Sequence, residues 1–387
     1  MKIAFVIYNY SESGGGVEHY ASDLAQVLLN RGDEVHIFCH NLKTQSSHPG
    51  LYFHSVPAAS FYRPFQWLRF ARNVAEMLKQ EQFDVVHGFG RTYSQDIYRV
   101  GSGCHWSYLE QTHPSMQTWP GRLLQKINPR NQVVLHLEKK SFQPGSYKKI
   151  VCISQMVKND IQRYYDVPDE DLEVIYNTVD PVRFHPDNKK KYREEVRKRF
   201  NLNEEEIILL FVGSGFERKG LRYAIDSLTL LPKDLRVRLL VVGKGRINKY
   251  KYLAERKKIA DKILFLGPQA QIEQYYAAAD IFLFPTLFEP FGTVCLEAMA
   301  SGLPVVTSQA AGASEILTNA IDAFVLENPR EVEPMAQKII FLSDPVWREN
   351  MGQVARLTAL KYSFEQHWPK VLKVYDDVFK IKINSGR

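Results

Sequence analysis

Short apolar runs rich in β-branched residues alternate with helical segments along the whole chain, and glycine-containing turns follow several of these runs. Lys2–Tyr8 is followed by Gly14–Gly16 and then by helical spacing over Val17–Arg31. Ile207–Val212 is followed by the turn Gly213–Gly220 and another helical segment. Strands that alternate with helices form parallel sheets covered by helices. The pattern therefore predicts an α/β fold with a Rossmann-like start in each half.

The chain has 387 residues, which favours two domains of roughly 180 residues each over one core. Asn177–Pro181 interrupts regular structure between the two α/β halves. We therefore expect an N-terminal domain over residues 1–180 and a C-terminal domain over residues 181–362. The remaining segment, 363–387, has helical character. No apolar run reaches the ~18 residues of a membrane-spanning helix.

The strongest candidates for ligand-binding side chains follow the predicted strand Ile281–Phe284. A loop that contains Glu289 follows this strand, and Thr293–Ala300 is predicted as a helix with Glu297 about one turn inside it. Ligands of α/β sheets bind beyond the carboxyl ends of the strands, and helix starts favour anions. We therefore expect an anionic ligand between these two carboxylates.

Two carboxylates beside an anion suit a ligand with hydroxyls on both sides of its phosphates, such as a nucleotide sugar. The spacing alone is equally compatible with a surface Glu289 and with a Glu297 that is favoured by the helix dipole. The residues between them are needed to separate these interpretations.

The segment from Glu289 to Glu297, with Phe291 and Gly292 inside it, resembles the retaining glycosyltransferases of family 4. That resemblance implies the GT-B fold, in which two Rossmann-like domains with parallel sheets face a cleft and a C-terminal helix crosses back onto the N-terminal domain. It implies that Glu289 contacts hydroxyls of the donor sugar and that Glu297 contacts the nucleotide ribose. The backbone of Phe291, Gly292 and Thr293 is expected to face the sugar.

Arg218 and Lys219 lie in the turn after the strand Ile207–Val212. As an isolated pair they would ordinarily be solvated surface residues, but a guanidinium and an ammonium there could also neutralise a diphosphate. The family resemblance implies phosphate binding. In the broad family pattern the two cations are commonly separated, whereas here they are adjacent. This shorter form looks most like bacterial lipopolysaccharide core glucosyltransferases that act on inner-core heptose.

The N-terminal half contributes two glycine-rich turns to the candidate site. His105 follows Gly101-Ser-Gly-Cys at a predicted strand end, and the resemblance makes it a candidate catalytic residue with Glu289, Arg218 and Lys219. The resemblance implies that Gly15 and Gly16 contact donor phosphate or acceptor, and consecutive glycines allow such a close backbone approach. A structural histidine and a flexible turn are the plainer interpretations.

The activity that the resemblance implies is transfer of a hexose with retained anomeric configuration, with UDP-glucose as the expected donor. The expected acceptor is a glycan or glycolipid of the cell envelope, namely lipopolysaccharide inner-core heptose. No metal or other cofactor is expected, because the basic pair can neutralise the leaving phosphate. Two alternatives stay open, a nucleotide-sugar 2-epimerase of the same fold and a non-catalytic membrane-associated protein.

The net charge of +7 and the pI near 9.0 indicate an anionic partner, and no nucleic-acid-binding motif is visible. Basic and aromatic residues gather in two segments, Tyr62–Arg72 and Trp106–Arg130. Each could bind an anionic membrane surface or pack on its own domain. The four scattered cysteines favour a reduced cytosol. We therefore expect a cytoplasmic protein, peripheral at the inner face of the cytoplasmic membrane.

Overall fold

The computed structural model describes residues 1–11, 14–44 and 47–385. The chain forms two compact units, which we call unit 1 (1–176 and 367–387) and unit 2 (177–366). Residues 386 and 387 of the expected C-terminal segment lie outside the described residues. Each unit contains a parallel sheet with helices packed on it, so the predicted α/β class is confirmed.

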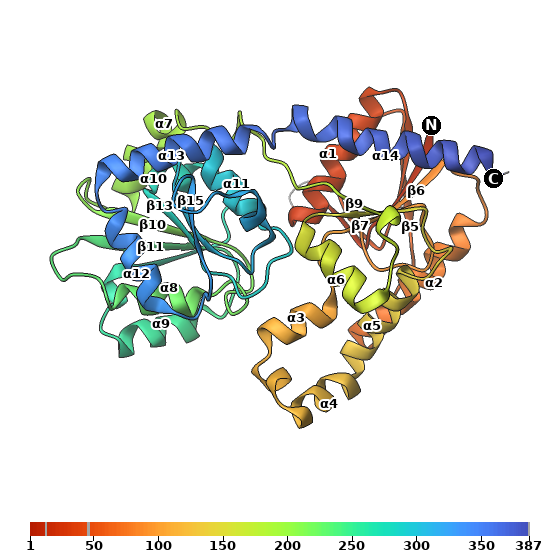
Figure 1. Ribbon diagram of the computed structural model, residues 1–387. Helices are drawn as coiled ribbons and strands as arrows, with labels where there is room; N and C mark the ends of the chain where they lie inside the picture. Colours follow the sequence, from red (N-terminus) through yellow and green to blue (C-terminus); the bar gives the residue numbers. More distant parts are fainter. Residues whose placement is uncertain (12–13, 45–46, 386–387) are drawn as a thin grey trace. The chain divides into compact units, whose positions relative to one another are not determined.

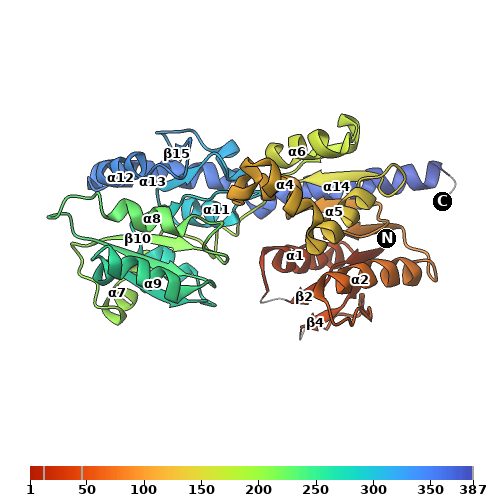
Figure 2. The same cartoon turned by 90° about the horizontal axis from the view of Figure 1, so that it is seen from below.

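Unit 1 is built on a seven-stranded sheet in the order β5-β3-β1-β6-β7-β8-β9. All neighbouring strands in it are parallel. The strands are β1 (Lys2–Val6), β3 (Glu34–Cys39), β5 (Leu51–Ser55), β6 (Val85–Gly88), β7 (Ile97–Val100), β8 (Lys149–Cys152) and β9 (Leu172–Val174). A separate pair of short strands, β2 (Asn9–Ser11) and β4 (Asn41–Lys43), lies next to α1 in Figure 2.

Helices cover both faces of this sheet. Successive side chains of β1 point to opposite faces, so the strand has apolar contacts on each side. Ala4 and Val6 pack with Phe70 and Val74 of α2, whereas Phe5 packs against His87 on the other face. The helices of unit 1 are α1 (Gly16–Asn30), α2 (Arg63–Leu78), α3 (His105–Thr112), α4 (Trp119–Ile127), α5 (Pro129–Ser141), α6 (Gln155–Tyr165) and most of α14 (Phe364–Asn384), with short 3₁₀ turns at Pro114–Gln117 and Asp169–Asp171. Figure 1 shows α3 and α4 extending from the sheet as an arm.

The last helix, α14, returns to unit 1, as the sequence predicted. His87 Nδ1 lies 2.5 Å from the hydroxyl of Tyr375. The ammonium of Lys382 donates a 2.8 Å hydrogen bond to the carboxylate of Asp96. These contacts join the last helix to β6 and to the start of β7, so the end of the chain completes the first unit.

Unit 2 is built on a six-stranded parallel sheet in the order β12-β11-β10-β13-β14-β15. Its strands are β10 (Ile207–Val212), β11 (Val237–Val242), β12 (Ile263–Gly267), β13 (Ile281–Phe284), β14 (Val305–Ser308) and β15 (Ala323–Leu326). Its helices are α7 (Asn188–Arg199), α8 (Leu221–Leu228), α9 (Ile247–Arg256), α10 (Glu273–Ala278), α11 (Thr293–Ala300), α12 (Val332–Phe341) and α13 (Pro345–Leu360), with 3₁₀ turns at Ala260–Lys262 and Gly312–Ile316. Figure 1 shows α7, α10, α11 and α13 on one side of the sheet and α8, α9 and α12 on the other.

The charged run Lys189–Arg199 would ordinarily be a helix exposed to solvent. It does form the helix α7, but Val196 and Arg197 are buried. The side chain of Arg197 is 1% exposed and donates a 2.7 Å hydrogen bond to the carboxylate of Asp280. Arg193 binds the other oxygen of the same carboxylate at 2.9 Å. These two cations fasten α7 to the start of β13 and so help to position the strand that leads into the candidate site.

Among the described residues, no helix combines the length and the apolarity that crossing a bilayer requires.

Candidate active site

The candidate site of unit 2 begins with the turn Gly213–Gly220, which we call the basic loop. It leaves the carboxyl end of the buried strand β10 and leads directly into α8. Gly220 has a φ of +75°, and a Cβ there would lie 1.8 Å from the carbonyl oxygen of Pro285. A side chain would therefore drive apart the basic loop and the loop that follows β13. Glycine at this position lets the two loops pack backbone to backbone.

Arg218 joins the same two loops by hydrogen bonds. Its backbone carbonyl accepts the Leu287 N–H at 2.8 Å. Its guanidinium donates to the carbonyl oxygen of Phe288 and to Oε2 of Glu289, both at 2.7 Å. Residues about 70 positions apart in the chain thus form a single platform at the carboxyl edge of the sheet.

Glu289 accepts a second charge-assisted hydrogen bond, from the ammonium of Lys219, on the same carboxylate oxygen. Burial by itself would raise the pKa of Glu289, but Lys219 and Arg218 hold that pKa below its usual value. Burial lowers the pKa of Lys219, and the Glu289 carboxylate opposes this shift. The carboxylate therefore acts as the counterion of both cations. An incoming phosphate offers the same kind of acceptor oxygen and could replace it.

The helix α11 starts next to this cluster. Gly292 precedes it with a φ of +96°, a conformation that glycine adopts without strain. Gly292, the N-cap residue, has no side chain that could cap the helix, and the Thr293 hydroxyl accepts a 3.0 Å hydrogen bond from Asn177. Phe291 as a whole is only 1% exposed, so the backbone contact with the sugar that the sequence suggested for it stays a prediction.

Glu297 is held by a residue that the sequence did not identify. The hydroxyl of Tyr276, on α10, donates a 2.8 Å hydrogen bond to Oε2 of Glu297. Burial raises the pKa of Glu297, and the Tyr276 hydrogen bond opposes that shift. Tyr276 itself is fully buried. A tyrosine inside an apolar helical segment carries no local sign of such a partner, which is why the pairing needed the structure.

The structure brings Arg218, Lys219 and Glu289 into direct contact, and Lys219 also acts electrostatically on Glu297. Seven of the ten predicted site residues belong to unit 2, namely Arg218, Lys219, Glu289, Phe291, Gly292, Thr293 and Glu297. The other three, Gly15, Gly16 and His105, belong to unit 1.

His105 is the first residue of α3 and lines a cavity of about 360 Å³ in unit 1. Its Nε2 lies 2.9 Å from Oδ1 of Asn131, and its backbone N–H donates to the buried carboxylate of Glu138. Burial lowers the pKa of His105, which favours the neutral imidazole. The cavity has aromatic and cationic walls formed by Tyr8, Trp67, Phe70, Tyr108, Arg91 and Arg130.

Gly15 and Gly16 form the start of α1. A Cβ on Gly15 would lie 2.9 Å from a carboxylate oxygen of Glu18, whereas a Cβ on Gly16 would meet no atom within 4 Å. Both glycines are exposed. The contact with phosphate or acceptor that the sequence suggested for them stays a prediction, and loop residues 12 and 13 lie outside the described residues.

Comparison with protein families assigns both halves of the chain. The family described as Glycosyltransferase Family 4 matches residues 14–183. The family described as Glycosyl transferases group 1 matches residues 192–358. The second match contains the basic loop, Glu289 and Glu297.

Relatives of known name cover nearly the whole chain. The lipopolysaccharide glucosyltransferase WaaG of Escherichia coli K12 is 26% identical over 92% of this chain and 94% of its own length. The N-acetyl-alpha-D-glucosaminyl L-malate synthase of Bacillus anthracis is 23% identical over 98% of this chain and 97% of its own length.

Solved structures show the same fold. The crystal structure of WaaG superposes with a TM-score of 0.83 at 24% identity and covers 98% of this chain and 99% of its own. Anabaena HepE in complex with UDP-glucose superposes with a TM-score of 0.70 at 17% identity and covers 99% of this chain and 100% of its own.

Proposed function

The chain is a glycosyltransferase of the GT-B fold, with a Family 4 domain followed by a group 1 domain, and we propose that it transfers glucose from UDP-glucose with retention of anomeric configuration. The proposed acceptor is a glycan or glycolipid, specifically the inner-core heptose of lipopolysaccharide. The name of the WaaG relative, a lipopolysaccharide glucosyltransferase, supports this choice of donor sugar and acceptor class. The HepE complex with UDP-glucose supports the choice of nucleotide.

One observation carries the proposal, namely the convergence of Arg218 and Lys219 on the carboxylate of Glu289. In the free protein one carboxylate binds both cations, and their two positive charges are available to neutralise the diphosphate when the donor binds. When UDP-glucose binds, its phosphate oxygens take over these donors, and Glu289 is released toward the hydroxyls of the sugar. This exchange keeps the buried Lys219 paired in both states, which avoids the cost of an isolated buried charge.

The same groups then serve the chemical step. The bond between the sugar C1 and the phosphate oxygen breaks, and the negative charge that grows on the leaving UDP is stabilised by Arg218, Lys219 and the start of α11. The acceptor hydroxyl attacks C1 from the face that the phosphate leaves. Its proton passes to an oxygen of the departing phosphate. No protein nucleophile takes part in this proposal, and no metal is required.

The two glutamates have different tasks in this account. Glu289 orients the hydroxyls of the transferred glucose, and its carboxylate stays ionised because its pKa is held low. Glu297 binds the hydroxyls of the ribose, and Tyr276 holds its carboxylate in place. A bound ribose would provide the polar partners that offset the burial of Glu297.

The cavity around His105 in unit 1 is the proposed binding place for the acceptor sugar. Aromatic walls such as Trp67 and Tyr108 suit the faces of sugar rings, and the guanidinium of Arg130 suits an anionic substituent on the acceptor. His105, neutral at pH 7, could either donate or accept a hydrogen bond. Gly15 and Gly16 keep their predicted role of approaching phosphate or acceptor through the backbone.

Peripheral membrane contact is the proposed way to reach a glycolipid acceptor, at the inner face of the cytoplasmic membrane. The helix α4 exposes Trp119 (77%) and Leu124 (62%) beside the cations Arg122 and Lys126. Exposed apolar side chains among cations are typical of helices that lie in a membrane interface. The predicted segment Trp106–Arg130 thus contains a helix suited to this role.

Two measurements test the proposed function. A thermal-shift screen against UDP-, GDP- and ADP-sugars should give the largest stabilisation with UDP-glucose, since a ligand stabilises the state that binds it. Product analysis then decides between the activities. Glucose on an acceptor supports transfer, a C2 epimer from the donor alone supports an epimerase, and no stabilisation by any nucleotide sugar supports a non-catalytic protein.

A further inference from the structure

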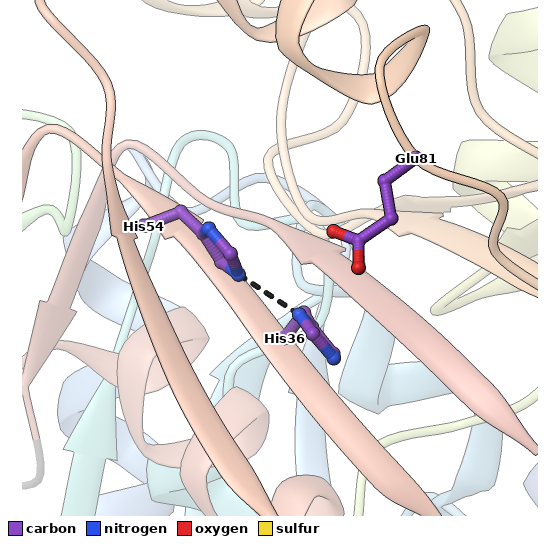
Figure 3. A group of neighbouring side chains, drawn as sticks. All are labelled: His36, His54 and Glu81. Atoms are coloured by element: carbon purple, nitrogen blue, oxygen red, sulfur yellow. Dashed lines mark hydrogen bonds between the residues drawn. The ribbon is translucent and has the colours of Figure 1, made fainter.

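Three side chains with metal-binding atoms lie together in unit 1, and none of them belongs to the candidate active site (Figure 3). His36 is on β3, His54 is on the edge strand β5, and Glu81 is in the turn between α2 and β6. One ligand atom from each lies within 4.8 Å of the other two. Figure 3 shows the Glu81 carboxylate directed toward His36.

The two imidazoles face each other through one nitrogen atom each, at hydrogen-bond distance. His36 Nδ1 lies 2.8 Å from His54 Nε2, and the ring planes are inclined by 16°. Two neutral rings that meet in this way hold one proton between two nitrogen lone pairs. A metal ion can take the place of that proton and bind both nitrogens when the proton of His54 moves from Nε2 to Nδ1, so that both rings bind as neutral imidazoles.

Glu34 gives His36 the orientation that a metal ligand needs. Its carboxylate oxygen lies 2.5 Å from His36 Nε2. A carboxylate at that distance accepts the Nε2 proton, which leaves the Nδ1 lone pair directed at His54. Metal-binding histidines characteristically donate their second N–H to a carboxylate in this manner. The pair of Glu34 and His36 therefore matches the support found around bound metals.

Charge and access also favour a cation. Glu34 and Glu81 bring two negative charges, and Lys2 brings one positive charge through its pair with Glu81. His36 is buried, whereas the side chains of Glu81 and Glu34 are 39% and 43% exposed and leave an entry route from solvent. In a tetrahedral zinc site two nitrogens are about 3.4 Å apart, given zinc–nitrogen bonds of about 2.0–2.1 Å. The rings need to separate by roughly half an ångström, and Glu81 must turn from Lys2 to the metal.

We propose that His36 Nδ1, His54 Nε2 and the Glu81 carboxylate bind one divalent ion of the zinc class, with water as the fourth ligand. Two imidazoles and one carboxylate form a ligand set that suits zinc, and imidazole also suits copper and nickel. The ion would join the edge strand β5 to β3 and to the turn before β6. Its expected effect is to stabilise unit 1, and it has no part in the proposed glycosyl transfer.

The test uses the full chain, stripped of metal with a chelator and then dialysed. Titration with Zn²⁺ in a calorimeter should give one site per chain, and Co²⁺ should give the intense visible bands of a tetrahedral nitrogen–oxygen site. The melting temperature should rise with the concentration of free Zn²⁺. Absence of a saturable site, or a Co²⁺ spectrum typical of the hydrated octahedral ion, would overturn the proposal.

Three variants assign the site to these residues. His54→Gln keeps a hydrogen-bonding side chain but removes a ligand, and it should lower Zn²⁺ affinity at least about 100-fold. Glu34→Gln leaves all three ligands and should lower affinity about 10- to 100-fold, because it removes the support of His36. His48→Gln is the matched control, because His48 is an exposed histidine of unit 1 outside the cluster, and it should leave affinity unchanged. Equal Zn²⁺ binding by His54→Gln and the wild type would contradict the assignment.

Discussion

Glu289 contacts both Arg218 and Lys219, and this contact leads to a prediction that would not follow if Glu289 only bound the sugar. In the free protein the Glu289 carboxylate competes with any phosphate for the donors of Arg218 and Lys219. Glu289→Gln keeps the shape of the side chain and removes this competing charge. We therefore expect the variant to bind UDP more tightly than the wild type, although it should transfer glucose more slowly.

The size of the effect follows from the two hydrogen bonds that change. A hydrogen bond to a charged partner contributes about 1.5–3 kcal/mol, and the bonds of the variant keep the charged donors Arg218 and Lys219, so they fall toward the lower end of this range. Replacing the carboxylate by an amide should weaken each competing bond by about 1 kcal/mol. Two such bonds give about 2 kcal/mol, which corresponds to roughly 30-fold tighter binding of UDP.

Calorimetry with UDP measures this directly, because UDP has both phosphates but no sugar for Glu289 to contact. The matched control is Glu217→Gln, which removes a negative charge from the basic loop itself, next to Arg218, at a side chain that is 70% exposed. We expect little change in UDP affinity for that variant. If Glu289→Gln binds UDP no more tightly than the wild type or the control, Glu289 does not compete with the phosphates, and the exchange proposed here is wrong.

Three further predictions concern Glu297, the metal and the membrane. Burial raises the pKa of Glu297, so its ionisation costs stability as pH rises through that raised pKa. Glu297→Gln should therefore raise the melting temperature of unit 2 at pH 7, and it should weaken UDP binding roughly tenfold or more. A difference in melting temperature between the variant and the wild type that does not grow with pH would contradict this. Excess EDTA should leave the rate of glucose transfer unchanged, and strict dependence on added Mg²⁺ or Mn²⁺ would contradict the role of the basic pair. Anionic vesicles should bind the protein less tightly as salt rises, and Trp119→Ala should weaken that binding several-fold, whereas the matched change Trp347→Ala on α13 of unit 2 should not.

Local patterns in the sequence predict most of the strands and helices that position the candidate site. Strands β10 and β13 are continuous apolar runs, and the glycine turns after them mark where the chain leaves the sheet. The helices α8 and α11 follow at the predicted positions. Each of these features is set by neighbouring residues, so sequence alone is sufficient to find it.

Pairings between distant residues could not be predicted in the same way. Nothing near Arg218 indicates that Glu289 will accept its hydrogen bond, and nothing near Glu297 indicates Tyr276. The charged neighbours of Arg197 give no sign that its side chain is buried, yet Asp280 binds it inside the protein. Such contacts depend on how the strands are ordered in the sheet, which the periodicity of single segments does not encode.

Some elements were also missed because their local signal is weak. The edge strand β5 contains Tyr52, Phe53 and His54 without a continuous apolar run, and β15 has only four residues. The segment Trp106–Arg130, which could have been an irregular insertion, forms the helices α3 and α4 and leads into α5. Its many aromatic and basic residues obscured the helical spacing.

The most direct test of the central claim is the configuration of the sugar in the product. UDP-glucose, which carries α-linked glucose, is incubated with the protein and a truncated lipopolysaccharide that ends in inner-core heptose, and the anomeric proton of the transferred glucose is observed by NMR. If the anomeric configuration is retained, the transferred glucose is α-linked. If the reaction takes place at Arg218, Lys219 and Glu289, this product forms more slowly in Glu289→Gln. A β-linked glucose would contradict same-face attack. An α-linked product formed equally fast by the variant would show that the reaction takes place without this cluster.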